Sequence, residues 1–254
     1  MTPVLDWDYW LKPPADFALR LKAGEIHVWA ARLDAAPALP WMAWLAPEEL
    51  DHARKFRLER DRTFALASRG VLRHLLGEYL QTGPATVEFE RTSFGKPHLG
   101  RRFSEASLRF NVSHSHELGL FAFARSREIG VDVEKIRPDS ATEEFAGHCL
   151  APGEAARLRC LAAEERVQAF FECWTRKEAY LKACGQGLMR ELNTFEVAFG
   201  KETVPAILRV KDEPTAAEDW SVMNLRVGDS YAGALVMEAR DEAPKVSCFR
   251  WSWL

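Results

Sequence analysis

Three acidic side chains and one lysine have a spacing that could bring them to a single point. Asp132 and Glu134 lie in a segment whose apolar residues alternate, which predicts a strand with both carboxylates on one face. Glu178 and Lys182 have the i, i+4 spacing of neighbours on one side of a helix. If the strand packs on the helix, three carboxylates and an ammonium meet, a set that suits Mg²⁺ bridging a polyphosphate. The two segments together therefore indicate phosphoryl chemistry.

Each segment taken alone also has an ordinary structural interpretation. An Asp-x-Glu pair is common at the solvated edge of a strand, and Glu-x-x-x-Lys is the usual spacing of a helix salt bridge. The chemical interpretation depends on both segments occurring in one chain, together with candidates for binding an anion.

Such candidates occur in three places. Ser113 and His114 end an apolar strand segment and could donate to a phosphate, although a lone histidine is more often structural. Lys96 stands between a glycine and a proline, which would present its ammonium from a rigid turn, although a solvated lysine is the default there. A basic run concentrates positive potential in a chain of net charge −3: Arg54, Lys55, Arg57, Arg60 and Arg62.

The elements that must position these residues follow from hydrophobic periodicity. Helices are predicted from about Pro47, over 62–80 with a stop at Gly83-Pro84, and between Pro138 and a stop at Gly185 and Gly187. The Ser126-Arg127 pair is predicted to be a tight hairpin turn. Strands are predicted over 25–31, 87–89, 107–113, 118–124, 128–134, 193–199, 205–211, 220–227, 231–238 and 245–252. This pattern predicts an α+β chain with an N-terminal lobe over 1–125 and a C-terminal lobe over 126–254.

The composition limits the class of protein. The 254 residues are 47% hydrophobic and 28% charged, so a sizeable core is expected. No segment approaches the roughly 20 apolar residues of a membrane span, and residues 1–22 lack the apolar run of a signal peptide. Five cysteines form no Cys-x-x-Cys pair. We therefore expect a cytoplasmic protein without a membrane or nucleic-acid partner.

Four segments, in their order, resemble the 4'-phosphopantetheinyl transferase superfamily, and specifically its long, monomeric surfactin-type class. They are FGKPHL (94–99), FNVSHS (110–115), GVDVEKIRP (130–138) and FFECWTRKEAYLKACGQGL (170–188). The resemblance covers roughly residues 45–190. Each segment alone is moderately specific, and all of them at compatible spacing are highly specific.

The resemblance implies transfer of the phosphopantetheine arm of coenzyme A to a serine hydroxyl of an acyl or peptidyl carrier protein, leaving adenosine 3',5'-bisphosphate. Asp132, Glu134 and Glu178 match the family's Mg²⁺ ligands. Glu178 also matches the group that accepts the serine proton, directly or through a metal-bound water. Lys182, which stabilises or protonates the leaving phosphate, and His114 complete the implied catalytic set. Contacts to coenzyme A are implied for Ser113, His114, Lys182, Lys96, Arg62 and, at the 3'-phosphate, Arg54 or Lys55.

The resemblance also implies a fold, a pseudo-twofold pair of similar α/β lobes, each with an antiparallel-rich sheet packed on helices. Coenzyme A would bind in the cleft between them, in a monomer. Two other functions stay open. A metal-dependent phosphodiesterase or nuclease would call for Glu-x-Lys on one strand and a wider basic surface. A non-catalytic relic that binds coenzyme A or the carrier would require a lost metal ligand.

Overall fold

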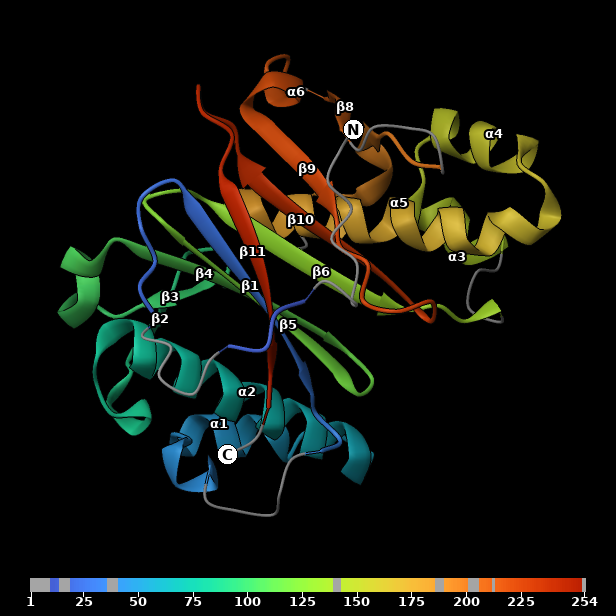
Figure 1. The fold of residues 1–254 in the computed structure, drawn as a ribbon. Coiled ribbons are helices and arrows are strands. Elements are labelled where there is room, and N and C mark those ends of the chain that lie inside the picture. Colours follow the sequence, from blue (N-terminus) through green and yellow to red (C-terminus); the bar gives the residue numbers. More distant parts are fainter. Residues whose placement is uncertain are drawn as a thin grey trace.

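Two β-sheets lie face to face, and each has a long helix on its outer side (Figure 1). The computed structural model describes residues 10–13, 19–35, 41–138, 143–185, 190–200, 206–211 and 213–252. The first sheet has the order β11-β1-β5-β4 and the second β6-β10-β9. All pairings are antiparallel except β1 with β11. The predicted α+β architecture with antiparallel-rich sheets packed on helices is confirmed.

The elements have the following bounds. The strands are β1 (Glu25–Arg32), β2 (Phe89–Arg91), β3 (Pro97–Leu99), β4 (Leu108–Ser115), β5 (Leu118–Arg125), β6 (Ile129–Lys135), β7 (Phe195–Val197), β8 (Ile207–Val210), β9 (Trp220–Asn224), β10 (Tyr231–Glu238) and β11 (Lys245–Trp251). The α-helices are α1 (Pro47–Ala53), α2 (Glu59–Leu80), α3 (Glu143–Cys149), α4 (Pro152–Cys160), α5 (Ala163–Cys184) and α6 (Ala216–Asp219). Small two-stranded sheets pair β2 with β3 and β7 with β8.

Alternation along β1 explains the layers. Ile26, Val28 and Ala30 pack in the core between the two sheets, whereas Trp29 and Ala31 pack in the core beneath α2. Because successive side chains of a strand point to opposite faces, a central strand between two cores is apolar on both. The sequence of β1 therefore matches its place in the middle of the molecule.

Two local predictions need correction. The helix predicted over 62–80 begins at Glu59 and ends before Gln81, whose φ of 53° breaks it ahead of Gly83. The hairpin at Ser126-Arg127 is wrong, because β5 and β6 belong to different sheets and do not pair. These two residues instead carry the chain from one sheet to the other. At α5, Gly185 ends the helix with φ 70° as predicted, while Gly187 and residue 205 lie outside the described residues.

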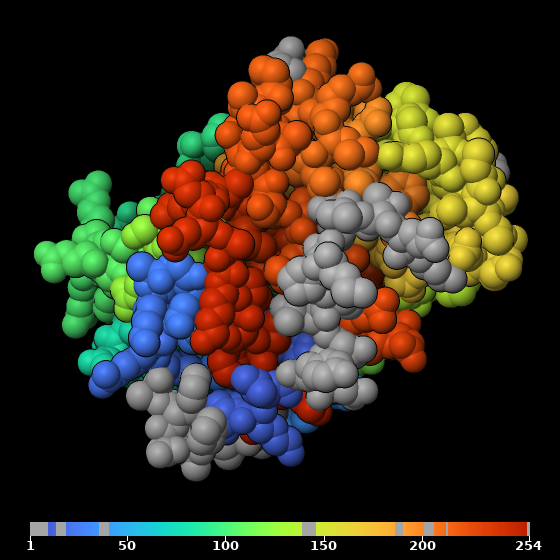
Figure 2. All heavy atoms as spheres, turned by 45° about the horizontal axis from the view of Figure 1, so that its top comes forward, coloured from blue at the N-terminus to red at the C-terminus, as the bar shows by residue number. Residues whose placement is uncertain are grey.

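The last strand crosses between the predicted lobes. β11 pairs in parallel with β1, from Glu25 opposite Lys245 to Ala31 opposite Trp251. Figure 2 shows this C-terminal segment, in red, lying against blue N-terminal residues. The boundary at 125/126 stays a prediction, and any division into lobes must assign β11 to the sheet of β1.

A buried histidine holds β1 to α2. His27 Nδ1 is 2.7 Å from the Tyr79 hydroxyl, which also accepts the Trp29 indole N–H at 2.9 Å. The Tyr79 hydroxyl can either donate to His27 Nδ1 or accept from it, depending on the imidazole tautomer. Burial lowers the pKa of His27 from 6.5 to about 4, and Lys245 adds to the shift against the opposing effect of Glu25.

We expect His27 to make the fold sensitive to acid. Its pKa is lowered on folding, so the unfolded chain binds more protons between about pH 4 and pH 6.5, and stability is lost as the pH falls through this window. The free energy of unfolding should fall by up to about 3 kcal/mol from this group. Urea unfolding across the window measures it, with His27→Leu as the variant in which this part of the pH dependence disappears. Equal pH dependence in both proteins would contradict the assignment.

No helix in the part of the chain that the structure describes has the length and apolar character needed to cross a membrane.

Candidate active site

Strand β6 and helix α5 bring the predicted lysine and first carboxylate into contact. Lys182 Nζ lies 2.6 Å from Asp132 Oδ1, and Ser113 Oγ donates to the same oxygen at 2.7 Å. Lys182 also donates to Ser113 Oγ at 2.9 Å. Asp132 is only 2% exposed, and its Oδ2 is buried without a hydrogen-bond partner. A buried carboxylate oxygen with no donor is a place where a cation would be stabilised.

The charge of Asp132 contributes to raised pKa values of Glu134 and Glu178. Burial and then the neighbouring charge of Asp132 raise the pKa of Glu134 to about 7, although Ser115 Oγ donates to its Oε2 at 2.8 Å. Burial and Asp132 likewise raise the pKa of Glu178, while Lys182 opposes the shift. Three carboxylates therefore share one ammonium. The cluster has an excess of negative charge that a cation would relieve.

The carboxylates fit a divalent cation by their chemistry. Their oxygens are the hard ligands that Mg²⁺ prefers, and Asp132 Oδ2 is free to bind one. Within the described ranges, however, no three His, Cys, Asp or Glu side chains already form a metal-binding set. Metal binding by Asp132, Glu134 and Glu178 stays a prediction.

Side chains of β4 join the two sheets where backbone pairing is missing. Asn111 Oδ1 accepts the Val131 N–H at 2.8 Å, and Ser115 Oγ accepts the Lys135 N–H at 3.1 Å. Ser113 lies between them on the same face of β4 and reaches Asp132. Ser113, predicted to contact coenzyme A, thus lies within the acidic cluster in this structure.

His114 points away from Ser113 into a groove of about 920 Å³ between α1, α2, β2 and β4. Its neighbours there include the cationic residues Lys55, Arg69, Arg73 and Arg91. Burial, followed by the charge of Lys182, lowers the pKa of His114, so its imidazole is neutral at neutral pH. Four carboxylates, Glu48, Glu49, Asp51 and Glu88, also line this groove, so its charges are mixed, and at His114 it lies next to Ser113 of the acidic cluster.

The sequence interpretation missed Arg69, Arg73 and Phe89. The two guanidinium carbons lie 5.0 and 5.2 Å from the centre of the Phe89 ring. Glu49 holds both arginines, with Oε1 2.9 Å from Arg69 Nε and Oε2 2.7 Å from Arg73 Nε. The available signal in the sequence was Arg73, an arginine among the apolar residues of the predicted helix. In the structure its side chain is 3% exposed.

The other predicted cations lie outside the lining of this groove. Arg54 is exposed and pairs with Asp51 at 2.7 Å, and Arg62 donates to the Phe56 carbonyl at 3.3 Å. Lys96 donates to Glu128 Oε2 at 2.8 Å, to the Ala183 carbonyl at 3.0 Å and to the Ile129 carbonyl at 3.3 Å. Lys96 therefore ties the β2–β3 hairpin to the end of α5. Contact of these three residues with coenzyme A stays a prediction.

A second hollow adjoins the groove at His114. It has a volume of about 310 Å³ and is lined in part by Arg60, His116 and Arg137. Ser115 also lines it, and Ser115 binds Glu134. Asp61, which pairs with Arg60, lines it too, so the hollow has a small excess of positive charge next to the carboxylates.

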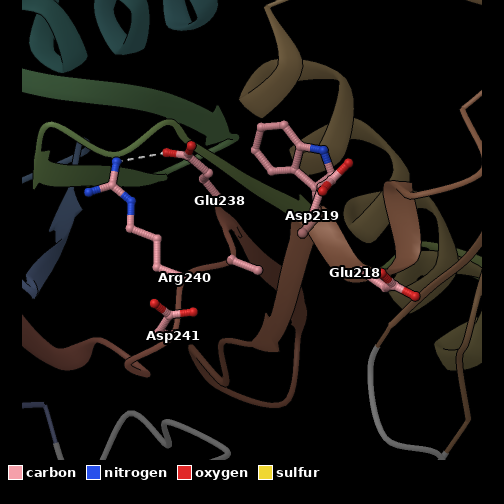
Figure 3. Close-up of a pocket in the computed structure, with 7 residues that line it drawn as sticks. Glu218, Asp219, Glu238, Arg240 and Asp241 are labelled. Carbon is pink, nitrogen blue, oxygen red and sulfur yellow. Dashed lines mark hydrogen bonds and ion pairs between the residues drawn. The ribbon is translucent and has the colours of Figure 1, made fainter.

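An open acidic pocket elsewhere lacks these features. Its volume is about 500 Å³, and Glu218, Asp219 and Asp241 line it with the Glu238–Arg240 ion pair (Figure 3). None of the predicted site residues lines it. Its negative charge does not suit a phosphate ligand.

Gly130 lets α5 approach β6 closely enough to form the site. A Cβ at this position would lie 2.0 Å from the Ala179 carbonyl oxygen and 2.4 Å from the Ala183 nitrogen. Both clashes are with backbone, which cannot turn aside.

We expect Gly130→Ala to destabilise the protein by at least about 3 kcal/mol, because α5 must move off the sheet. Gly147→Ala is the matched control, since a Cβ there meets nothing within 4 Å. The control should be neutral or stabilise helix α3 by up to about 1 kcal/mol. Urea unfolding compares the two, and equal stability of both variants would show that α5 does not depend on Gly130.

Comparison with known proteins identifies the family. A family model described as "4'-phosphopantetheinyl transferase superfamily" matches residues 128–236, and one described as "4'-phosphopantetheinyl transferase, N-terminal" matches residues 36–125. The 4'-phosphopantetheinyl transferase HetI of Nostoc sp. is 38% identical over 238 residues, covering 93% of this chain and 96% of that protein. The 4'-phosphopantetheinyl transferase Sfp of Bacillus subtilis is 28% identical over 157 residues, 62% of this chain and 67% of that protein.

Solved structures give a weaker likeness. A holo-(acyl-carrier-protein) synthase of Bacillus anthracis in complex with CoA (3',5'-ADP) has 20% sequence identity and a TM-score of 0.35, covering 44% of this chain and 94% of that one. The assignment therefore depends on the sequence relatives. With family models matching both halves and 38% identity along nearly the whole of HetI, this chain belongs to the 4'-phosphopantetheinyl transferase superfamily, in its long, Sfp-like type.

Proposed function

We propose that this protein transfers the 4'-phosphopantetheine group of coenzyme A to a serine hydroxyl of an apo acyl or peptidyl carrier protein. One observation carries the proposal: His114 lines the large groove while the adjacent Ser113 bonds to Asp132 and Lys182. A nucleotide in the groove would thus place its pyrophosphate at the acidic cluster. Family membership supports the same activity.

The reaction exchanges one phosphorus–oxygen bond for another. The carrier serine oxygen attacks the phosphorus that bears pantetheine, and the bond from that phosphorus to the bridging oxygen breaks. The leaving group is adenosine 3',5'-bisphosphate. Glu178 accepts the serine proton, directly or through a water. Lys182, within reach of Asp132 and Ser113, stabilises the negative charge that develops on the leaving phosphate.

Asp132, Glu134 and Glu178 would hold Mg²⁺. When bound, Mg²⁺ neutralises charge on the pyrophosphate and orients it for in-line attack. Support comes from the charge balance of the cluster and the unpartnered Asp132 Oδ2. Until the metal and the substrate bind, Lys182 keeps the buried Asp132 neutralised and in place.

The cationic hollow beside the site supports an acidic partner. Arg60, His116 and Arg137 would face a carrier protein whose serine enters at Glu134 and Glu178. All of the proposed groups come from one chain, so a monomer suffices.

The experiment is intact-mass spectrometry of an apo carrier protein after incubation with this protein, coenzyme A and Mg²⁺. We expect a gain of one phosphopantetheinyl group, which is absent with EDTA and absent on a carrier whose acceptor serine is replaced by alanine. Both acyl and peptidyl carriers are used. If a folded protein that binds coenzyme A modifies none of them, the proposal is wrong.

Among the five cations of the basic run at 54–62, Lys55 lines the groove. Lys55→Ala should raise KM for coenzyme A by about 3-fold to 10-fold with little change in kcat, because one cation near the bound phosphates is lost. Lys245→Ala is the control, because Lys245 is 76% exposed and lies outside the groove lining. Steady-state kinetics measure both, and an equal rise in KM for the two variants would mean that only diffuse charge matters.

A further inference from the structure

A salt bridge between two fully buried residues adjoins Glu178. Lys177 Nζ lies 2.6 Å from Glu154 Oε2, and neither side chain has any exposed surface. Burying such a pair generally adds little net stability compared with apolar side chains of the same volume, because both charges lose their hydration. The pair therefore needs an explanation other than stability.

Besides their salt bridge, the two side chains form hydrogen bonds with four backbone groups. Lys177 Nζ donates to the carbonyls of Leu192 at 2.7 Å and Phe195 at 2.6 Å. Glu154 accepts the Ala151 N–H on Oε2 at 2.8 Å and the Val197 N–H on Oε1 at 2.7 Å. The pair thus joins α5 to the start of α4, to the turn before β7 and to β7 itself.

The anchors fix how α5 is turned about its own axis. Successive side chains of an α-helix differ by about 100° in direction, so the direction of Lys177 sets that of Glu178. Gly130 separately sets how deep the helix lies on β6, through its contacts with Ala179 and Ala183. Gly130 thus limits the depth of α5, and the buried pair is one of the contacts that hold its rotation.

We propose that Glu154 and Lys177 are positioning residues that fix the rotation of α5 and thereby aim Glu178 and Lys182 at Asp132. This inference rests on the proposed function, because the aim of these side chains matters only if they act there. A small rotation would widen the cluster and weaken both metal binding and the chemical step, while the groove for coenzyme A lies on other elements.

The test is the double variant Glu154→Gln/Lys177→Met, which removes both buried charges and leaves neither alone. Val222→Ala is the control, which makes a cavity in the apolar core on β9 and leaves both charged side chains in place. Each protein is studied well below its own melting temperature. The readouts are the affinity for Mn²⁺ alone, measured by electron paramagnetic resonance, and kcat and KM for coenzyme A.

We expect the double variant to bind Mn²⁺ at least about 10-fold more weakly and to lose at least about 10-fold in kcat, with KM for coenzyme A within about 2-fold of wild type. Val222→Ala should lose stability alone. If the double variant does not fold, Glu154→Asp replaces it. This variant keeps both charges but draws the carboxylate back by one carbon, and it should show the same selective loss to a smaller degree.

The outcomes separate the two proposals. An active wild type together with folded pair variants that keep wild-type Mn²⁺ affinity and kcat would overturn the positioning role and leave the function standing. A wild type that neither binds Mn²⁺ nor modifies a carrier would overturn the function, and the positioning role with it.

Discussion

Asp132→Asn lowers kcat for carrier modification by at least about 1,000-fold, which corresponds to about 4 kcal/mol of transition-state stabilisation. Asparagine keeps the shape of the side chain and can still accept from Ser113 and Lys182 through its oxygen. It loses the charge, and its amide places two hydrogens where Asp132 Oδ2 now lies without a partner. Steady-state kinetics and Mn²⁺ affinity measure the loss.

The matched control is Asp229→Asn, which removes the same charge from an exposed position. It should retain kcat within about 2-fold, because an exposed charge outside the site is screened. An Asp132→Asn protein with the kcat of this control would show that the β6 carboxylate takes no part in the reaction.

Lys182→Met lowers kcat by about 100-fold to 1,000-fold, because a donor aimed at the developing charge is lost. The same change should also destabilise the resting protein by about 2 kcal/mol, since it leaves the buried Asp132 carboxylate with Ser113 as its remaining hydrogen-bond donor. The two effects are measured by kinetics and by urea unfolding.

Lys245→Met serves as the control for this second prediction. Its side chain is 76% exposed and lies 4.0 Å from Glu25, so its loss should change neither quantity measurably. Full activity of a folded Lys182→Met protein would remove this lysine from the mechanism. Lost activity with unchanged stability would show that the ion pair with Asp132 is energetically neutral.

Local periodicity predicted which side chains meet in the acidic cluster between β6 and α5. Asp132 and Glu134 share a strand face because side chains alternate, and Glu178 and Lys182 share a helix face because of the i, i+4 spacing. Gly130 lies on the same strand face and was the available sign that α5 packs there, since the helix backbone needs the space of the missing Cβ.

Long-range packing explains what the sequence could not supply. Five similar cations occupy residues 54–62, and only the folded chain shows that Lys55 lines the groove while Arg54 pairs with Asp51. The placement of Lys96 depends on the carbonyls of Ile129 and Ala183, which lie far along the chain. The parallel pairing of β11 with β1 joins residues more than 200 positions apart, and no local sequence pattern predicts it.

The most direct measurement compares two products of one reaction mixture. Adenosine 3',5'-bisphosphate is quantified by chromatography while intact-mass spectrometry counts the phosphopantetheinyl groups gained by the carrier, with Mg²⁺ and with EDTA. Transfer at this site predicts equal amounts of the two, both dependent on the metal and both lost in Asp132→Asn. Bisphosphate released without any gain on the carrier would instead mean hydrolysis of the pyrophosphate bond of coenzyme A and would contradict the proposed transfer.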